Sequence, residues 1–240
     1  MRPHLFLRLG MVAMLCSPAA AQAAVPGMAT PGIGTDAVRT MLILTMLAVV
    51  PAILISMTSF IRIVVVLSMV RHAFGMPETP PNPVLVSLAL FLTAFTMSPT
   101  FSAMNANALQ PLMAGKIPVE QAMARGSGPL RDFMLAQTRD SDIEAIYAIA
   151  KTPVPDRPEQ VEILKLAPAF ILNELRVAFT IGFVILLPFL LIDLVVASIL
   201  LALGMMMVPP ATISLPIKIL MFVLIDGWGL ILQGVLGSFR

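Results

Sequence analysis

The sequence predicts an all-α, helical integral membrane protein, and its composition and apolar runs carry that prediction. Hydrophobic side chains make up 58% of the 240 residues and charged side chains 12%, and the mean hydropathy is +0.95. A soluble globular domain has about twice that share of charge. The apolar residues also fall in runs of the length that a membrane-spanning helix needs, about 20 residues. About four hydrophobic helices in two hairpins, with an amphipathic helical insert between them, account for these runs.

Residues 1–24 have the order of a secretory signal peptide, with a basic start and then an apolar run from Leu9 to Cys16. The cleavage region would comprise Ala21, Ala23 and Ala24. The apolar run is too short to cross a bilayer, which takes about 20 residues. The alternative is an N-terminal helix that is disordered or lies at the membrane interface. Cleavage would make residues 25–37, rich in Pro, Gly and Thr, the exported N-terminal segment.

Residues 38–104 are expected to form the first hydrophobic hairpin. The apolar run from Val38 to Val70 is broken by Pro51, by Thr58 with Ser59, and by Arg62, so it is expected to hold one span and a second, tilted or re-entrant helix. A proline-rich turn follows at residues 71–83. An apolar helix without charge is then expected from Val84 to Met104.

Residues 105–165 differ in composition from the rest of the chain, because they hold 7 of its 15 basic and 8 of its 13 acidic residues. Apolar side chains recur here at i, i+3 and i+4, which predicts two amphipathic helices that separate near Asp140. This polar helical segment is expected to lie outside the cytoplasm. The positive-inside rule supports that orientation through Arg62 and Arg71 on the inner side.

Residues 166–240 are expected to form the C-terminal hydrophobic hairpin. Its two apolar helices are predicted at Ala167–Leu203 and Ala211–Leu236, and the loop between them carries three consecutive methionines. These are Met205, Met206 and Met207. Methionine is flexible and apolar, so in a ring of subunits these side chains would form a soft seal that excludes ions by dewetting. The alternative is that they only pack the turn against lipid or a neighbour.

Ionisable side chains within the apolar segments are costly, at roughly 2.5–3.5 kcal/mol each on insertion scales. They are Arg62, Glu174, Arg176, Asp193, Lys218 and Asp226. If the chain folds back at Met206, Asp193 lies 13 residues before the bend and Lys218 lies 12 after it. Both then stand roughly 19 Å from the bend. We expect them to form a buried ion pair, since either charge alone would be uncompensated. The pair would either hold the hairpin together or relay protons.

For the other charged residues, the spacing along the sequence does not indicate a partner. Glu174 and Arg176 are two residues apart and point to different faces of a helix, so their partners are expected elsewhere, for example on another subunit. Arg62 has the option of snorkelling to the membrane interface.

The composition excludes several classes of function. One cysteine and two histidines leave no ligand set for a metal, and a net charge of +2 does not indicate a nucleic-acid partner. No nucleophile-elbow, zinc-protease, phosphate-loop or dinucleotide motif occurs. A dyad of Ser214 and Lys218 is disfavoured because Pro216 lies between them. We therefore expect no catalytic activity and no cofactor.

Two long runs of the sequence are similar to a known family. They read TSFIRIVVVLSMVRHAFGMPETPPNPVLVSLALFLTAFTMSP at 58–99 and FILNELRVAFTIGFVILLPFLLIDLVVASILLALGMMMVPPATISLPIKILMFVLIDGW at 170–228. Together with the signal peptide they resemble the FliP family of flagellar type III export-gate proteins, related to SctR of virulence secretion systems. The methionines with the prolines after them, and the DGW triplet, are the most specific part.

The resemblance implies a function that composition does not show. Members of the family form a ring, implied to be of five protomers, which joins FliQ and FliR in a helical cone above the plane of the bacterial inner membrane. Unfolded flagellar subunits pass through this export gate of the basal body, driven by the proton motive force and an ATPase complex. The resemblance further implies that Met205, Met206 and Met207 form the pore gasket, that Phe133 and Glu174 contact a neighbouring protomer, and that Asp193 and Lys218 are the family's charge pair.

Two rival functions stay open at this point. A secondary transporter or proton-channel subunit would use Asp193, Lys218 and Asp226 as a relay, although the inverted repeats typical of such folds are not evident. An intramembrane enzyme would need a nucleophile and a base that the apolar helices do not supply.

Overall fold

The computed structural model describes residues 55–75, 80–155 and 157–239, with scattered positions between 37 and 51. The scattered positions are helical, and those up to residue 48 belong to a separate unit, Met1–Ala48. The second unit, Val49–Arg240, holds all the other elements. The predicted signal peptide, its cleavage region and nearly all of the exported segment lie outside the described residues, as does most of the first expected span.

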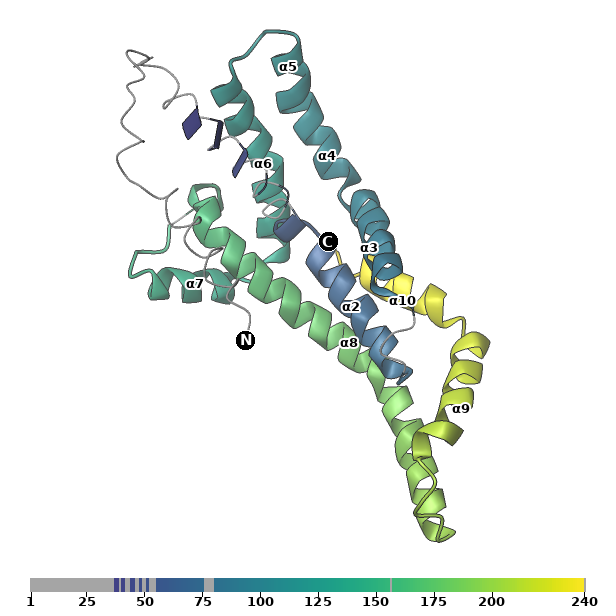
Figure 1. The fold of residues 1–240 in the computed structure, drawn as a ribbon. Helices are drawn as coiled ribbons and strands as arrows, with labels where there is room; N and C mark the ends of the chain where they lie inside the picture. Colours follow the sequence, from purple (N-terminus) through teal and green to yellow (C-terminus); the bar gives the residue numbers. More distant parts are fainter. Residues whose placement is uncertain are drawn as a thin grey trace, which may run out of the picture. The chain divides into compact units, whose positions relative to one another are not determined.

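Every regular element in the described residues is a helix, so the all-α prediction is confirmed. The α-helices are α2 (Phe60–Ala73), α3 (Asn82–Thr96), α4 (Ser98–Met104), α5 (Gln110–Met113), α6 (Val119–Gln137), α7 (Asp140–Ile149), α8 (Ile163–Ala202), α9 (Pro210–Leu224) and α10 (Gly227–Leu236) (Figure 1). A π-helical turn, η2 (Asn105–Leu109), joins α4 to α5, and a 3-10 turn, η3 (Pro158–Gln160), precedes α8.

Helix α8 is the element against which most of the others pack. It runs for 40 residues, and Pro168 and Pro188 lie inside it without ending it. Helices α2, α6, α7 and α9 each contact it. Of the described helices, α8 alone is long and apolar enough to cross a membrane, and there are up to three such spans if each of two bent helix pairs counts as one.

The first bent pair corrects the single apolar helix expected at Val84–Met104. Helix α3 ends at Thr96, and the chain turns by 61° into the segment Ser98–Met113. Pro99 accounts for the break, because it has no N–H to donate to the carbonyl of Phe95, and its ring crowds that carbonyl.

The second bent pair corrects the helix expected at Ala211–Leu236. Helices α9 and α10 meet at an angle of 67°, and Asp226 between them has a left-handed backbone with φ of 50°. Pro216 lies inside α9 and does not end the helix. A left-handed residue redirects the chain abruptly, which a continuous helix does not allow.

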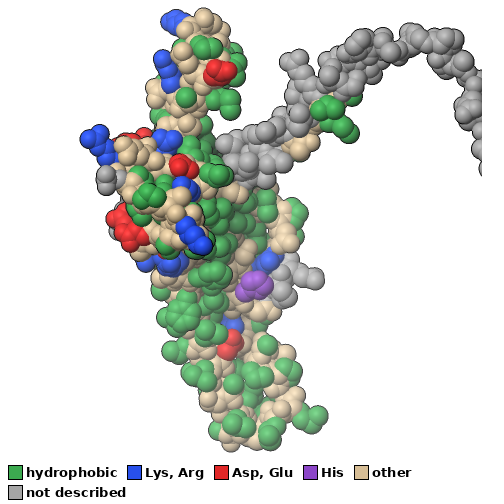
Figure 2. Space-filling model, turned by 90° about the vertical axis from the view of Figure 1, so that its left-hand side faces the viewer, with side chains coloured by type: hydrophobic (Ala, Val, Ile, Leu, Met, Phe, Trp, Pro, Cys, Tyr) green, Lys and Arg blue, Asp and Glu red, His purple; other side chains and the backbone are tan. Residues whose placement is uncertain are grey.

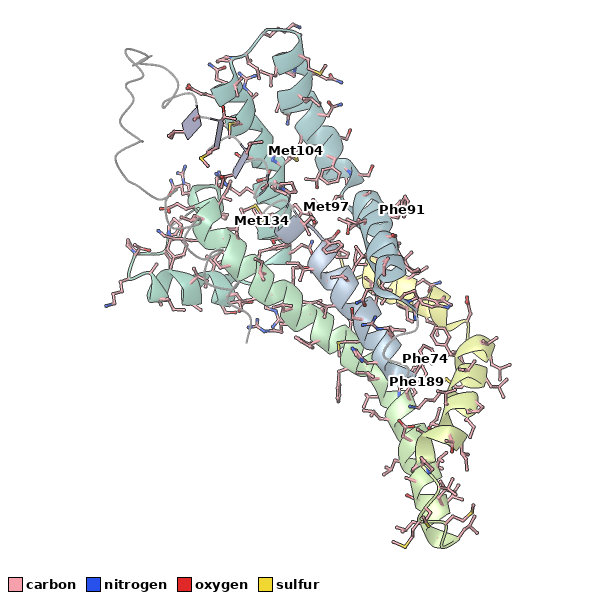
Figure 3. All side chains as sticks on the ribbon, viewed as in Figure 1. Phe74, Phe91, Met97, Met104, Met134 and Phe189 are labelled. Carbon is pink, nitrogen blue, oxygen red and sulfur yellow. The ribbon has the colours of Figure 1, made fainter. Side chains whose placement is uncertain are left out.

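Two hydrophobic clusters hold the helices together. The first cluster fills the space between α2, α3, α8, α9 and α10, and one face of α2 supplies Ile63, Val66, Leu67 and Val70 at helical spacing. In this cluster the ring of Phe74 meets those of Phe189 and Phe222 edge to face, at 5.2 Å and 5.0 Å between ring centres (Figure 3). Edge-to-face pairs are a favoured aromatic geometry.

The second cluster lies where α6, α7 and the start of α8 meet. Its buried members include Leu130 and Met134 of α6, Ile143 and Tyr147 of α7, and Phe170 of α8. Helix α6 ends at Gln137 and α7 begins at Asp140, so the prediction of two amphipathic helices that separate near Asp140 is confirmed.

The packing of α8 against α2 generates a prediction about Gly182. A Cβ at this position would lie 2.3 Å from Sδ of Met69 and 3.1 Å from its Cβ, so the helices meet where Gly182 has no side chain. We expect Gly182→Ala to lower the free energy of unfolding by about 1–3 kcal/mol through overpacking. Gly128→Ala is the matched control, because no atom lies within 4 Å of the Cβ it would gain. The thermal unfolding midpoints of the two detergent-extracted variants test this, and equal midpoints would contradict it.

Candidate functional site

Three charged residues of α8 each form an ion pair within the chain. Glu174 pairs with Arg62 of α2, Arg176 with Asp142 of α7, and Asp193 with Lys218 of α9. The pairs therefore connect α8 to three other helices. Those of Glu174 and Arg176 lie within one helical turn of each other, and that of Asp193 lies further along the helix.

The pair of Arg62 and Glu174 is the most deeply buried of the three, since the side chains are 1% and 0% exposed. Nε of Arg62 donates to Oε2 of Glu174 at 2.8 Å, and Nη2 donates to Oε1 at 2.5 Å. This two-point contact is the strong geometry for a guanidinium and a carboxylate. Removing both charges from water costs several kcal/mol per ion, so the pair requires full hydrogen bonding.

The other N–H groups of Arg62 donate to acceptors in two other segments of the chain. Nη1 donates to the carbonyl oxygen of Ser238 at 2.8 Å and to its hydroxyl at 2.9 Å. Nη2 also donates to Oε1 of Gln137 at 3.3 Å. The ring of Phe239 lies 4.0 Å from Cζ and covers the face of the guanidinium. A guanidinium has five N–H groups, and five acceptors surround this one.

This geometry corrects two sequence predictions. Arg62 does not snorkel to an interface, because α2 packs along α8 and directs it at Glu174. Glu174 does not need a counter-charge from another subunit, because its buried carboxylate is already paired with Arg62 of its own chain. Its implied role at a subunit interface stays a prediction. Phe133 is half-buried, with its ring 5.9 Å from that of Phe170, and its contact with a neighbour stays a prediction.

Arg176 also finds its partner within the chain. Nη1 donates to Oδ2 of Asp142 at 2.7 Å. Asp142 lies in the first turn of α7, where the helix dipole favours a negative charge. Asp142 is buried and Arg176 is half-exposed, so this pair is partly open to its surroundings. Sequence reasoning missed Asp142, although an acid in the first turn of an amphipathic helix was the available signal.

Asp193 and Lys218 lie at the same depth of the hairpin, as the residue count from Met206 indicated. Nζ of Lys218 donates to Oδ2 of Asp193 at 2.6 Å. It also donates to the carbonyl of Ala73 at 3.1 Å, which lies at the end of α2. The expectation that both charges are buried needs correction, since the side chain of Lys218 is 6% exposed but that of Asp193 is 41% exposed. One side of the carboxylate thus remains open in the single chain.

The three methionines occupy the tip of the hairpin between α8 and α9. Helix α8 ends with a reversal in which Gly204, at φ of 74°, takes the left-handed conformation. The N–H of Gly204 bonds to the carbonyl of Leu201 at 3.1 Å, and that of Met205 bonds to the carbonyl of Leu200 at 2.9 Å. This is the paired bonding of a Schellman motif. It leaves Met206 and Met207 81% and 97% exposed.

Asp226 has a different role from the other charges. It lies between α9 and α10, exposed, and its side chain accepts a hydrogen bond from the N–H of Gly229 at 3.4 Å. Among the described residues it forms no ion pair, so its grouping with the charges inside helices is corrected to a cap at a helix break. In the same part of the chain, no three His, Cys, Asp or Glu side chains are grouped as a metal would require.

The fold and these pairs define a class of protein: a strongly apolar helical chain in which long helices are joined by internal ion pairs and a hairpin presents an exposed apolar tip. Residues 43–235 match the FliP family. The chain belongs to that family.

Individual relatives agree with this assignment. The flagellar biosynthetic protein FliP of Pectobacterium carotovorum is 52% identical over 79% of this chain and 73% of its own. Its counterpart from Bacillus subtilis is 50% identical over 80% of this chain and 87% of its own. That of Caulobacter vibrioides is 47% identical over 79% of this chain and 71% of its own. The resemblance inferred from the sequence is therefore confirmed.

The burial of the Arg62 pair generates a prediction. Glu174→Gln would leave the buried guanidinium without a counter-charge, so we expect a loss of about 3–5 kcal/mol in the free energy of unfolding. Asp142→Asn is the matched control, because the guanidinium of Arg176 is half-exposed and stays accessible to solvent, and we expect it to cost about 1 kcal/mol or less. Denaturation of both variants in the same detergent measures the difference. A loss for Glu174→Gln no larger than that of the control would contradict the prediction.

Proposed function

We propose that the chain is a pore-forming subunit of the flagellar type III protein export gate, through which unfolded flagellar subunits cross the bacterial inner membrane. Its membership of the FliP family and the flagellar names of its relatives support a place in this export apparatus. The single observation that supports a pore-forming role is the exposed methionine tip of the α8–α9 hairpin.

A ring of such chains would bring the methionine tips together around an axis. Met206 and Met207 extend from the hairpin and contact little of their own chain, so they are available to one another and to a passing polypeptide. Thioether side chains adapt to surfaces of varied shape. An apolar constriction also excludes ions by dewetting, which keeps a wide export pore closed between substrates.

The hairpin is built to hold its tip in place. Lys218 links Asp193 of α8 to the carbonyl of Ala73 at the end of α2, so α9 is fastened to two helices at once. Below this point the hairpin extends beyond the other helices (Figure 1). The contacts of Lys218 thus favour a structural role for the pair. The exposed side of the Asp193 carboxylate is available for contact with a neighbouring protomer.

Large apolar faces support assembly with other chains. Exposed aromatic side chains occur on α3 and on α8, at Phe91, Phe95, Phe179 and Phe183. In Figure 2 most charged side chains gather over the end that holds the polar helices, and the tip of the hairpin shows hydrophobic side chains and no charged ones. Apolar faces of this extent need lipid or protein to cover them. We propose that further copies of this chain, implied to be five in all, together with FliQ and FliR, cover them in the basal body.

A non-catalytic role fits the same geometry. Lys218 already donates to the carboxylate of Asp193 and to the carbonyl of Ala73, so we propose no role for it as the partner of Ser214 in a catalytic dyad. We propose no cofactor and no nucleic-acid partner.

The oligomeric state tests the gate directly. We expect the detergent-extracted chain to have the native mass of a discrete ring, and this mass to grow when FliQ and FliR are co-expressed. Native mass spectrometry measures both. A monomer or dimer that is indifferent to those partners would contradict the gate and return the choice to a transporter or proton-channel subunit.

The methionine tip makes a second prediction. Replacing Met206 and Met207 by serine should raise the leak of small ions several-fold, because polar side chains hydrate an apolar constriction. Met113→Ser is the matched control, since this methionine is also exposed but lies at the end of α5. Ion flux into vesicles that contain the assembled gate measures the leak. No added leak, or the same leak from the control, would remove the seal from the proposal.

A further inference from the structure

The break between α9 and α10 is built by three consecutive residues, Asp226, Gly227 and Trp228. Asp226 is left-handed at φ of 50° and caps α10. A Cβ on Gly227 would lie 2.2 Å from the ring of Phe222, so the bend closes only around a glycine. The ring of Trp228 then meets that of Phe222 edge to face, at 5.5 Å between centres. These residues are the DGW triplet of the sequence, and the proposed function does not use them.

The far end of α10 is fastened to a different part of the molecule. Ile231 and Val235 are buried in the first cluster, and Ser238 and Phe239 follow the helix onto Arg62. The hydroxyl of Ser238 accepts from Nη1 of Arg62 and donates to the carbonyl of Val235 at 2.6 Å. The end of α10 is thus closed by the same guanidinium that pairs with Glu174.

We infer that α9 and α10 form a latched hinge, in which Asp226 and Gly227 are the hinge and the contact of Ser238 and Phe239 with Arg62 is the latch. Releasing the latch lets α10 leave the first cluster. The chain from Pro210 to Leu236 then approaches a continuous apolar helix, which has the length and composition to cross a membrane. Only the residues at the break must change their backbone angles, as hinges require.

The guanidinium of Arg62 keeps hydrogen-bond partners both when the latch is closed and when it is released. A polar cavity of about 460 Å³ lies beside Arg62, and Gln137, Asn173 and Ser238 are among the residues that line it. A cavity of this size and polarity admits water, which would replace the two acceptors that Ser238 supplies. The pair of Arg62 with Glu174 stays intact, so release does not leave an uncompensated charge. This inference concerns the chain itself and does not depend on the proposed function.

The test uses a cysteine at Val235, which is buried beneath the latch. In the full-length chain in native membranes, with Cys16→Ser to remove the natural thiol, Val235→Cys should react slowly with a maleimide. The Ser238→Ala/Phe239→Ala variant removes a hydrogen bond to a charged group and the stacked ring, so we expect the labelling rate to rise by roughly tenfold. Gly227→Ala should raise it as well, because its Cβ cannot coexist with the ring of Phe222 in the bend.

Two controls separate hinge opening from general loosening. Gly234→Ala adds a Cβ to α10 with no atom within 4 Å, so it should leave the rate unchanged. Val161→Cys reports on the second cluster and should label at the same slow rate in every variant. Unchanged labelling at Val235→Cys would overturn the hinge, and a rise in Gly227→Ala alone would overturn the latch. An equal rise at Val161→Cys would overturn both, since it would mean that the whole chain loosens.

Discussion

The guanidinium of Arg62 lies in the interior of an apolar chain and bonds to three other segments. Glu174 of α8 supplies the counter-charge, Gln137 at the end of α6 supplies one acceptor, and Ser238 beyond α10 supplies two. A buried charge that loses its partner destabilises the fold by about 3–5 kcal/mol, because the charge is left uncompensated. The positions of these segments are therefore tied to one another, and the rest of the structure depends on that arrangement.

The same physical requirement repeats along α8. Arg176 fastens α7 through Asp142, and Asp193 fastens α9 through Lys218, which in turn bonds to the end of α2. In an apolar environment, contact between two apolar helix faces gives little preference for one neighbour over another. Each ion pair joins α8 to a different helix and so favours that helix at its own position along α8.

This arrangement gives the two ends of the C-terminal hairpin different properties. The α8–α9 tip is set by a Schellman motif at Gly204 and braced by Lys218, which suits the proposed constriction. The α9–α10 bend is set by a left-handed Asp226 and is held from a distance through Arg62. The proposed seal and the proposed hinge thus lie at opposite ends of the same helix, α9.

The sequence by itself determined the helical class, the two amphipathic helices that separate near Asp140, and the family. It also determined that Asp193 and Lys218 lie at the same depth of the hairpin. Composition, periodicity and residue counts along a straight helix are local quantities, so they can be read without coordinates. Only the tertiary structure decided the partners of Arg62, Glu174 and Arg176, and the bends at Pro99 and Asp226. Arg62 and Glu174 are 112 positions apart, and no local pattern records that α2 packs along α8. Whether a proline bends a helix also depends on the surrounding packing, and for that reason Pro99 does so while Pro188 and Pro216 do not.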